Sequence, residues 1–440
     1  MQIKIDTEKK IGAIKRMNAT GQAPMGGGIG YGAYNHFHFL SDISVPYVRL
    51  HDVGGGFAAN RFVDVPNIFR DFDADENDEA NYDFAFTDTY IEALYKNGLK
   101  AYYRLGVTIE NNAEVKSYRI DPPKDYEKWA RICEHIIAHY NEGWANGYHY
   151  DIEYWEIWNE PDDGLRVSQM WNGTAEDYYR LYDVAAKHLK KRFPNIKIGG
   201  YAAIGFYKAV MSEEEIAAHP DPHRLQYFID FFHGFIKYIK EHNSPIDFFS
   251  WHSYSKPDKF IKEAKWACEQ LKAYGYGNIE THINEWNPPC RNKRDKAVHG
   301  AEIAAIMLGT QNTDVDMLMI YDARLLESTY NAFFVPSIDD PVHLRLSHGY
   351  YTFAAFSVLA KLGTQVALEC DTDGVYAVAA SDGKRGAVMI SNISGANQAL
   401  CIEGVDLSDA RWYILDDRRL LSWSPELKEI KNNTVVLVEF

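Results

Sequence analysis

Two Asn-Glu pairs are the residues in this sequence best suited to chemistry: Asn159-Glu160 and Asn284-Glu285, each with a Trp and a Pro close by. Two carboxyl groups that flank a glycosidic bond can cleave it, because one protonates the leaving oxygen while the other attacks the anomeric carbon or activates water. A separation of about 5 Å gives retention of configuration and about 6.5–9.5 Å gives inversion, and the sequence leaves this distance open. Asn-Glu pairs are common, so a structural role for either glutamate is the alternative.

Both pairs lie at the end of a short apolar segment that is typical of a β-strand, and such segments alternate with amphipathic stretches of helical length. Eight repeats of this kind predict an α/β protein with a closed (β/α)8 TIM barrel rather than an open doubly wound sheet. Catalytic groups gather at the carboxyl ends of barrel strands, so Glu160 and Glu285, on strands four and seven, are expected to face each other over one sugar. The predicted strands are 28–34, 45–52, 100–107, 154–161, 196–201, 246–254, 280–287 and 315–323.

Side chains alternate between the two faces of a strand, so strand parity indicates what surrounds the glutamates. A cation beside one carboxyl lowers its pKa and keeps it ionised as a nucleophile. Two neighbouring carboxyls push their pKa values apart, which leaves one of them protonated as the acid. Glu156 shares the face of Glu160 and needs a partner there, for which Arg49 and Arg104 are the candidates. The side chains expected to face inward on strands two, four and six are Arg49, His51, Tyr154, Glu156, Trp158, Glu160, Ser250, His252 and Tyr254.

Several of these residues allow two interpretations. Trp158 and Trp286 either fill the core or offer a flat platform to the apolar face of a sugar. His51 and His252 either contact substrate or are hydrogen-bonded histidines of the core. Arg49 is either part of the catalytic site or only an ion-pair partner.

The pattern of the sequence changes after about residue 363, where short β-like runs are separated by turn signals such as Asp382-Gly383 and Ser394-Gly395. This pattern predicts a small all-β, sandwich-like appendage. The strand-like run at residues 2–5 is a candidate to pair with it. We therefore expect a catalytic barrel over residues 21–360 and an accessory β domain formed by residues 1–20 and 361–440.

The composition argues against a nucleic-acid-binding protein and against a membrane-spanning one. Acidic residues outnumber basic ones by 62 to 46, the net charge is −16 and no Lys/Arg stripe is present, which argues against a nucleic-acid partner. The sequence contains no run of about 18 apolar residues, so no membrane span is predicted. The charged N-terminus lacks the apolar core of a secretory signal, which favours a cytoplasmic protein. The five scattered cysteines suit reduced thiols, and a homo-oligomer is left open.

No cofactor or metal ion is expected, although two segments superficially suggest one. Gly28-Ile-Gly-Tyr-Gly-Ala33 matches the G-x-G-x-x-A pattern of dinucleotide sites, but a loop-like segment precedes it where such a site needs a strand. Residues 71–79 place acidic oxygens at alternate positions, yet they lack the Gly and the Glu that a calcium-binding EF-hand loop requires. A solvated acidic loop is the better interpretation of that segment.

Longer motifs around the two glutamates resemble clan A glycoside hydrolases, and within that clan they resemble glycoside hydrolase family 39, which holds β-xylosidases and α-L-iduronidases. The likeness covers about residues 30–350 and is strongest over 154–290. It is carried by Glu156-Ile-Trp-Asn-Glu-Pro-Asp162 and by the segments 171–178 (WNGTAEDY), 183–187 (DVAAK), 198–200 (IGG) and 247–254 (DFFSWHSY).

The resemblance assigns roles to particular residues. It implies that Glu160 is the acid/base and Glu285 the nucleophile of a retaining mechanism, that Asn159 binds the sugar 2-hydroxyl and that Tyr254 contacts the nucleophile. It further implies that the glycone subsite, which holds the terminal sugar, is lined by His51, His252 and Glu327.

These roles imply an exo-acting glycosidase that removes a terminal sugar from a plant-type oligosaccharide, with β-xylosidase as the first expectation. An arabinosidase, galactosidase or glucosidase is the alternative within the same class. A carbohydrate-binding barrel without turnover is the alternative from another class. Residues 51–86, which follow strand two on the face of the active site, do not match the xylosidases of the family, so the shape of the sugar subsite is left open.

Overall fold

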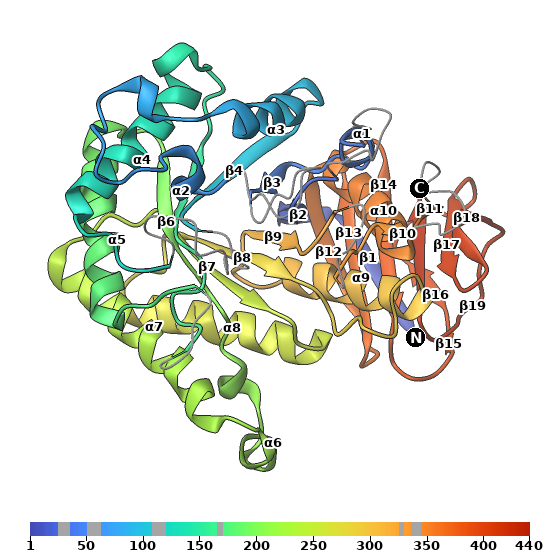
Figure 1. The fold of residues 1–440 in the computed structure, drawn as a ribbon. Coiled ribbons are helices and arrows are strands. Elements are labelled where there is room, and N and C mark those ends of the chain that lie inside the picture. The colour runs from blue at the N-terminus through green and yellow to red at the C-terminus, as the bar shows by residue number, and fades with distance from the viewer. Residues whose placement is uncertain (25–35, 51–62, 108–119, 165–169, 325–329, 336–344) are drawn as a thin grey trace.

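Eight parallel strands close into a barrel in chain order, and this barrel lies beside a separate eight-stranded sheet (Figure 1). The computed structural model describes residues 1–24, 36–50, 63–107, 120–164, 170–324, 330–335 and 345–440. The predicted barrel with a β appendage is confirmed. The barrel strands are β2 (Arg16–Gly21), β3 (Tyr47–Arg49), β4 (Lys100–Leu105), β5 (Tyr154–Ile157), β6 (Lys197–Ala203), β7 (Phe248–Ser253), β8 (Glu280–Trp286) and β9 (Met317–Ile320).

The first barrel strand is β2, which pairs in parallel with β3 on one side and with β9 on the other. The prediction that residues 28–34 supply this strand is therefore wrong, and those residues lie outside the part of the chain that the structure describes. The sequence did not indicate β2 as a strand, because two of its buried residues, Asn18 and Thr20, are polar and interrupt the apolar pattern. Asn18 compensates by donating from its Nδ2 to the carbonyl oxygen of Ser44 at 3.0 Å.

Helices cover the outside of the barrel, and α5 (Ala175–Arg192) shows why the sequence forms them. Thr174 and Asp177 make a reciprocal capping box at its start, and three basic residues at its end favour the negative pole of the helix dipole. The other helices are α1 (His38–Asp42), α2 (Val65–Ile68), α3 (Ala85–Lys96), α4 (Tyr126–Asn141), α6 (Glu213–Ala218), α7 (Pro222–His242), α8 (Pro257–Tyr274), α9 (Ala297–Gln311) and α10 (His348–Leu362), with 3-10 turns η1 (Glu79–Asn81), η2 (Trp144–Asn146) and η3 (Tyr207–Val210). Among the described residues, no helix has both the length and the apolar composition that a membrane span needs.

The accessory sheet combines the two ends of the chain, which both lie beside it in Figure 1. Its N-terminal strand β1 (Gln2–Ala13) pairs antiparallel with β12 (Thr364–Cys370) and in parallel with β16 (Cys401–Glu403). The remaining strands in sheet order are β13 (Val375–Ser381), β14 (Gly386–Asn392), β20 (Thr434–Glu439), β17 (Arg411–Asp416) and β18 (Arg419–Ser424). Two small ribbons complete the described strands: β10 (Phe334–Val335) with β11 (Arg345–Leu346), and β15 (Gln398–Ala399) with β19 (Glu429–Ile430).

Helices α9 and α10 lie between the barrel and this sheet, so the two parts share a core (Figure 1). The alternation along β14 divides its side chains accordingly. Ala387 and Met389 face the main core, whereas Val388 and Ile390 face a second apolar cluster on the other side of the sheet.

The interior of the barrel is layered, and this layering places the functional groups. Tyr47, Tyr102, Tyr154 and Phe248 belong to one buried cluster that fills the barrel. Two positions further along the same four strands, at the next inward-facing position, the residues are Arg49, Arg104, Glu156 and Ser250. A polar layer therefore rests on an aromatic one, toward the carboxyl ends of the strands.

Truncation of Phe353 tests the shared core. Its ring is buried on α10, with its centroid 4.7 Å from that of Phe333. Phe353→Ala is expected to lower the free energy of unfolding by about 3–5 kcal/mol in urea titrations, because the change removes apolar burial and leaves a cavity. Trp423→Ala is the control, since Trp423 lies on edge strand β18 and is 68% exposed. Equal stabilities of the two variants would contradict the placement of α10.

Candidate active site

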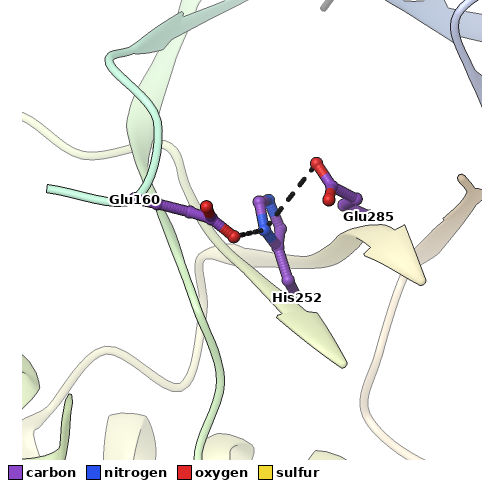
Figure 2. A group of neighbouring side chains, drawn as sticks. All are labelled: Glu160, His252 and Glu285. Carbon is purple, nitrogen blue, oxygen red and sulfur yellow. Dashed lines mark hydrogen bonds and ion pairs between the residues drawn. The ribbon is translucent and has the colours of Figure 1, made fainter. Parts of the chain in front are cut away.

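Three residues from three strand ends meet at the mouth of the barrel: Glu160 after β5, His252 on β7 and Glu285 on β8. The His252 Nδ1 lies 2.6 Å from an oxygen of Glu160 and 3.8 Å from an oxygen of Glu285. One oxygen of each carboxyl and one histidine nitrogen all lie within 4.8 Å of one another. Figure 2 shows the imidazole between the two carboxyl groups. The two glutamates predicted from the sequence are thus neighbours across the barrel.

The direction of Glu160 is set by a break in the strand rather than by strand alternation. Strand β5 ends at Ile157, and both Trp158 and Glu160 have positive φ angles, of 75° and 47°. The backbone is fixed by neighbouring strands, since the Trp158 N–H donates to the Leu105 carbonyl at 2.7 Å and the Glu160 N–H donates to the Ala202 carbonyl at 3.0 Å. This bend turns the Glu160 side chain toward His252.

The structure decides between the two interpretations that the sequence left open for Trp158 and Trp286, and it corrects the expectation that Trp158 faces inward. Trp158 does not share the inward face. Its ring is buried 5.1 Å from that of Trp171, and its Nε1 donates to the Met170 carbonyl at 2.9 Å. Trp286 follows Glu285 and points to the opposite side of β8, where it is buried against Phe260 of α8. The structure supports the core interpretation for both rings.

Arg49 connects the groups of the site, because one buried guanidinium contacts three side chains. Its Nε donates to Glu156 at 2.8 Å, one terminal nitrogen donates to the Asn159 Oδ1 at 2.6 Å, and the other lies 3.4 Å from a Glu285 oxygen. Of the two partners considered for Glu156, the structure therefore shows Arg49. Arg104, on the neighbouring strand, is also buried and inward-facing.

Glu156 lies one layer below the two catalytic candidates and is fully occupied. Beside Arg49, its other oxygen accepts hydrogen bonds from the Ser250 hydroxyl at 2.5 Å and from the side-chain amide of Asn284. A buried carboxylate needs a cation and hydrogen-bond donors to be stable, and this one has both. Glu156 therefore positions Arg49 and Asn284 and has no free oxygen for a substrate.

Glu285 is buried and held by two donors. The Tyr254 hydroxyl donates to one of its oxygens at 2.5 Å and Arg49 approaches the other. The pKa of Glu285 is raised above its ordinary value, chiefly by burial and also by the nearby Glu160, although Arg49 and the Tyr254 hydrogen bond act in the opposite direction. The contact of Tyr254 with this carboxyl, which the family resemblance implies, is present in the structure.

Burial lowers the pKa of His252 to about 4, and the positive charges of Arg49 and Arg104 act in the same direction against the opposing pull of Glu285 and Glu156. His252 is consequently neutral at pH 7. Its Nε2 is buried and has no hydrogen-bond partner among the described residues. The side-chain nitrogen of Asn159 is in the same situation, since only its Oδ1 is engaged, by Arg49.

Two predicted contacts, His51 and Glu327, lie outside the described residues. Sequence reasoning missed two others that the structure shows near the site. Tyr330 is 39% exposed, and its ring lies 5.0 Å from that of Tyr254. Glu263 is buried on α8, where its place within the apolar stripe of that helix was the signal that could have revealed it.

Glu160, His252 and Glu285 also have the spacing of a metal site. Their donor atoms are engaged in other ways, however. His252 makes a short hydrogen bond with Glu160, while Tyr254 and the Arg49 cation occupy Glu285. A cation would have to displace these partners and would lie close to the guanidinium. These contacts therefore favour the hydrogen-bonded state of Glu160, His252 and Glu285 over the binding of a metal ion.

Acid titration of stability tests the neutral state of His252. Its pKa is about 4 in the folded protein and about 6.5 when unfolded, so the unfolded chain binds more protons between these values. Neutral His252 makes its full contribution to the free energy of unfolding above pH 6.5. As the pH falls from 6.5 to 4, the free energy of unfolding decreases by about 3 kcal/mol in total. The difference in free energy of unfolding between the wild type and His252→Gln should shrink by this amount. A difference that is constant over this range would contradict the burial of an uncharged imidazole.

Comparisons with known proteins find relatives in sequence and in fold. A β-xylosidase from Geobacillus stearothermophilus is 22% identical over 296 residues, which are 60% of this chain and 52% of the relative, so the chain spans about half the length of that relative. A glucosidase structure from Croceicoccus marinus matches with a TM-score of 0.72 at 19% identity, covering 100% of this chain and 98% of the other. A monomeric β-xylosidase structure from Caulobacter crescentus CB15 matches with a TM-score of 0.69 at 15% identity, covering 100% and 99%. These two structures show the shared fold.

The family model described as Glycosyl hydrolases family 39 matches residues 34–355, a stretch that contains Glu160, His252 and Glu285. That stretch is well over half of the chain and includes every motif on which the resemblance in the sequence depends. The chain therefore belongs to glycosyl hydrolases family 39.

Proposed function

We propose that the chain is a retaining glycoside hydrolase in which Glu160 is the acid/base and Glu285 the nucleophile. The observation that carries this proposal is the approach of the two carboxyls, which bring one oxygen each within 4.8 Å of the other. Retaining enzymes hold their carboxyls about 5–5.5 Å apart, whereas inverting enzymes need room for a water molecule between carboxyl and sugar. An approach of one oxygen from each carboxyl to within 4.8 Å supports retention rather than inversion.

In the first step, the Glu285 carboxylate attacks the anomeric carbon while Glu160 gives its proton to the leaving oxygen, which forms a glycosyl ester on Glu285. In the second step, Glu160 takes a proton from a water molecule, which attacks the same carbon and releases Glu285. Arg49 and Tyr254 support the ionised form of Glu285, because each offers a donor to one of its oxygens. Mutual repulsion between the two carboxyls then favours the protonated form of Glu160.

Asn159 is the residue proposed to bind the sugar 2-hydroxyl. Arg49 holds its Oδ1, which fixes the amide and leaves the Nδ2 as a buried donor with no partner among the described residues. An unpaired buried donor costs about 1–3 kcal/mol, so a sugar hydroxyl that accepts from it gains that energy on binding. His252, His51 and Glu327 are proposed as further contacts of the glycone, on the family resemblance.

The proposed substrate is a terminal β-xyloside of a plant-type oligosaccharide. Relatives that carry the name β-xylosidase support this choice, in Geobacillus stearothermophilus and in Caulobacter crescentus. A glucosidase from Croceicoccus marinus has a similar fold, so a glucoside is the second candidate. Both sugars present the same groups to Asn159 and to the two carboxyls, and they differ in the C6 hydroxymethyl group.

A panel of nitrophenyl glycosides tests reaction and sugar together. Wild-type protein is expected to release nitrophenol fastest from the β-xyloside, compared with arabinosides, a galactoside and a glucoside. Glu285→Ala is expected to lower kcat by about 10⁴-fold or more, because the change removes the carboxylate that forms the proposed glycosyl ester. A 2-fluoro xyloside should label Glu285 covalently. Turnover of Glu285→Ala at the wild-type rate, or a label on another residue, would reject the assignment.

The dependence on leaving group tests Glu160. A poor leaving group needs a proton and a nitrophenolate does not, so Glu160→Gln should slow the release of an alkyl alcohol at least 100-fold more than that of dinitrophenol. Steady-state rates on a series of xylosides with graded leaving-group pKa give the comparison. A loss of equal size across the series would contradict the acid role, even if the variant is impaired.

A further inference from the structure

Glu263 is a buried carboxyl in the wall behind the active site. It lies on α8 within the apolar stripe formed by Phe260, Ala264 and Ala267, and its side chain is fully buried. No cation among the described residues lies within ion-pair distance of it. Burial raises the pKa of Glu263 to about 7. Burial of a carboxyl costs free energy unless hydrogen bonds compensate for the lost water, so the partners of Glu263 identify what it holds in place.

Those hydrogen bonds connect two loops at the mouth of the barrel. Glu263 accepts from the Phe206 N–H at 2.5 Å, in the segment that follows β6. It also accepts from the hydroxyls of Ser253 at 2.7 Å and Ser255 at 3.3 Å, at the end of β7. One carboxyl group thus fixes the residues on both sides of Tyr254.

The segment after β6 packs closely against this point. Gly205 has a φ angle of 138°, and a Cβ atom there would lie 2.8 Å from the His252 carbonyl oxygen and 3.0 Å from Glu263. Only glycine fits this approach. Tyr207, two residues later, accepts a hydrogen bond at its hydroxyl from the Tyr254 N–H at 3.3 Å. Tyr254 is therefore held through its own backbone and through both neighbouring serines.

We propose that Glu263 is a positioning residue that holds the end of β7 so that the Tyr254 hydroxyl meets the nucleophile Glu285. The chain of contacts runs from Glu263 to Ser253 and Ser255, then through the Tyr254 ring to a 2.5 Å hydrogen bond on Glu285. This inference rests on the proposed function, because the consequence of the contact is a change in turnover.

A double-mutant cycle tests this chain of contacts. Glu263→Ala is expected to lower kcat on nitrophenyl xyloside about tenfold with KM changed less than twofold, because a displaced Tyr254 affects the reacting carboxyl more than sugar binding. Glu263→Gln should recover part of this loss, since its amide oxygen still accepts from the Phe206 N–H. If Tyr254→Phe alone lowers kcat about 100-fold, the double variant with Glu263→Ala should also lose about 100-fold in kcat. Two independent effects would instead multiply to a loss of about 1,000-fold.

Asp247→Asn is the matched control, because Asp247 links β6 and β7 at the opposite end of the barrel. It accepts from the Ile198 N–H at 2.9 Å and from Lys190 at 2.8 Å. Its replacement is expected to lower the melting temperature and to leave kcat within twofold. A purely structural role for Glu263 predicts the same behaviour for its variants. If Glu263→Ala does not fold, the cycle is run with Glu263→Gln.

The outcomes separate this inference from the proposed function. An active wild type with unchanged kcat in the folded Glu263 variant, or losses that multiply in the double variant, would overturn the positioning role and leave the glycosidase assignment intact. A wild type that cleaves no glycoside of the panel would reject the proposed function and this inference with it. Reduced kcat, unchanged KM and a non-multiplicative cycle together support the positioning role.

Discussion

The buried guanidinium of Arg49 is the group on which the rest of the site depends. Three glutamates and a neutral histidine occupy the mouth of the barrel, and without a cation their burial would be strongly unfavourable. Arg49 contacts Glu156, Asn159 and Glu285 at once. Because the arginine is planar and has five donors in a fixed arrangement, fixing it in one position also fixes its three partners. Its own position comes from β3, one step above the aromatic layer that fills the barrel.

Glu156 makes this arrangement possible although it has no proposed chemical step. It takes the strongest contact of Arg49, so the guanidinium approaches Glu285 only at 3.4 Å. A nucleophile that was bound tightly by a cation would be ionised but poorly reactive. For Glu285 as the proposed nucleophile, the loose contact with Arg49 and the short one with Tyr254 favour the ionised form without a tight ion pair.

Sequence reasoning reached the fold, the family and the position of seven barrel strands, because apolar segments and motifs are local signals. It was wrong about the first strand, since Arg16–Gly21 is short, carries buried polar side chains and resembles a loop. It was also wrong about Trp158. Strand parity holds only while the backbone stays extended, and the positive φ angles after Ile157 depend on hydrogen bonds from β4 and β6 that no local pattern reveals. Glu263 was missed because its partners are two loops rather than neighbours in sequence.

The neutral state of His252 affects how the two carboxyls proposed as catalytic influence each other. A charged imidazole between them would lower the pKa of both carboxyls and stabilise two carboxylates, neither of which is suited to act as an acid. A neutral imidazole does not compensate the repulsion between the two carboxylates. Their pKa values are therefore pushed apart, and one carboxyl is ionised while the other stays protonated. Arg49 and Tyr254 both donate to Glu285, and Glu160 makes a short hydrogen bond to the same uncharged ring. In the proposed mechanism, the donors on Glu285 favour the negative charge there, and the repulsion between the two carboxyls favours the proton on Glu160, which is the division of roles that a retaining glycosidase needs.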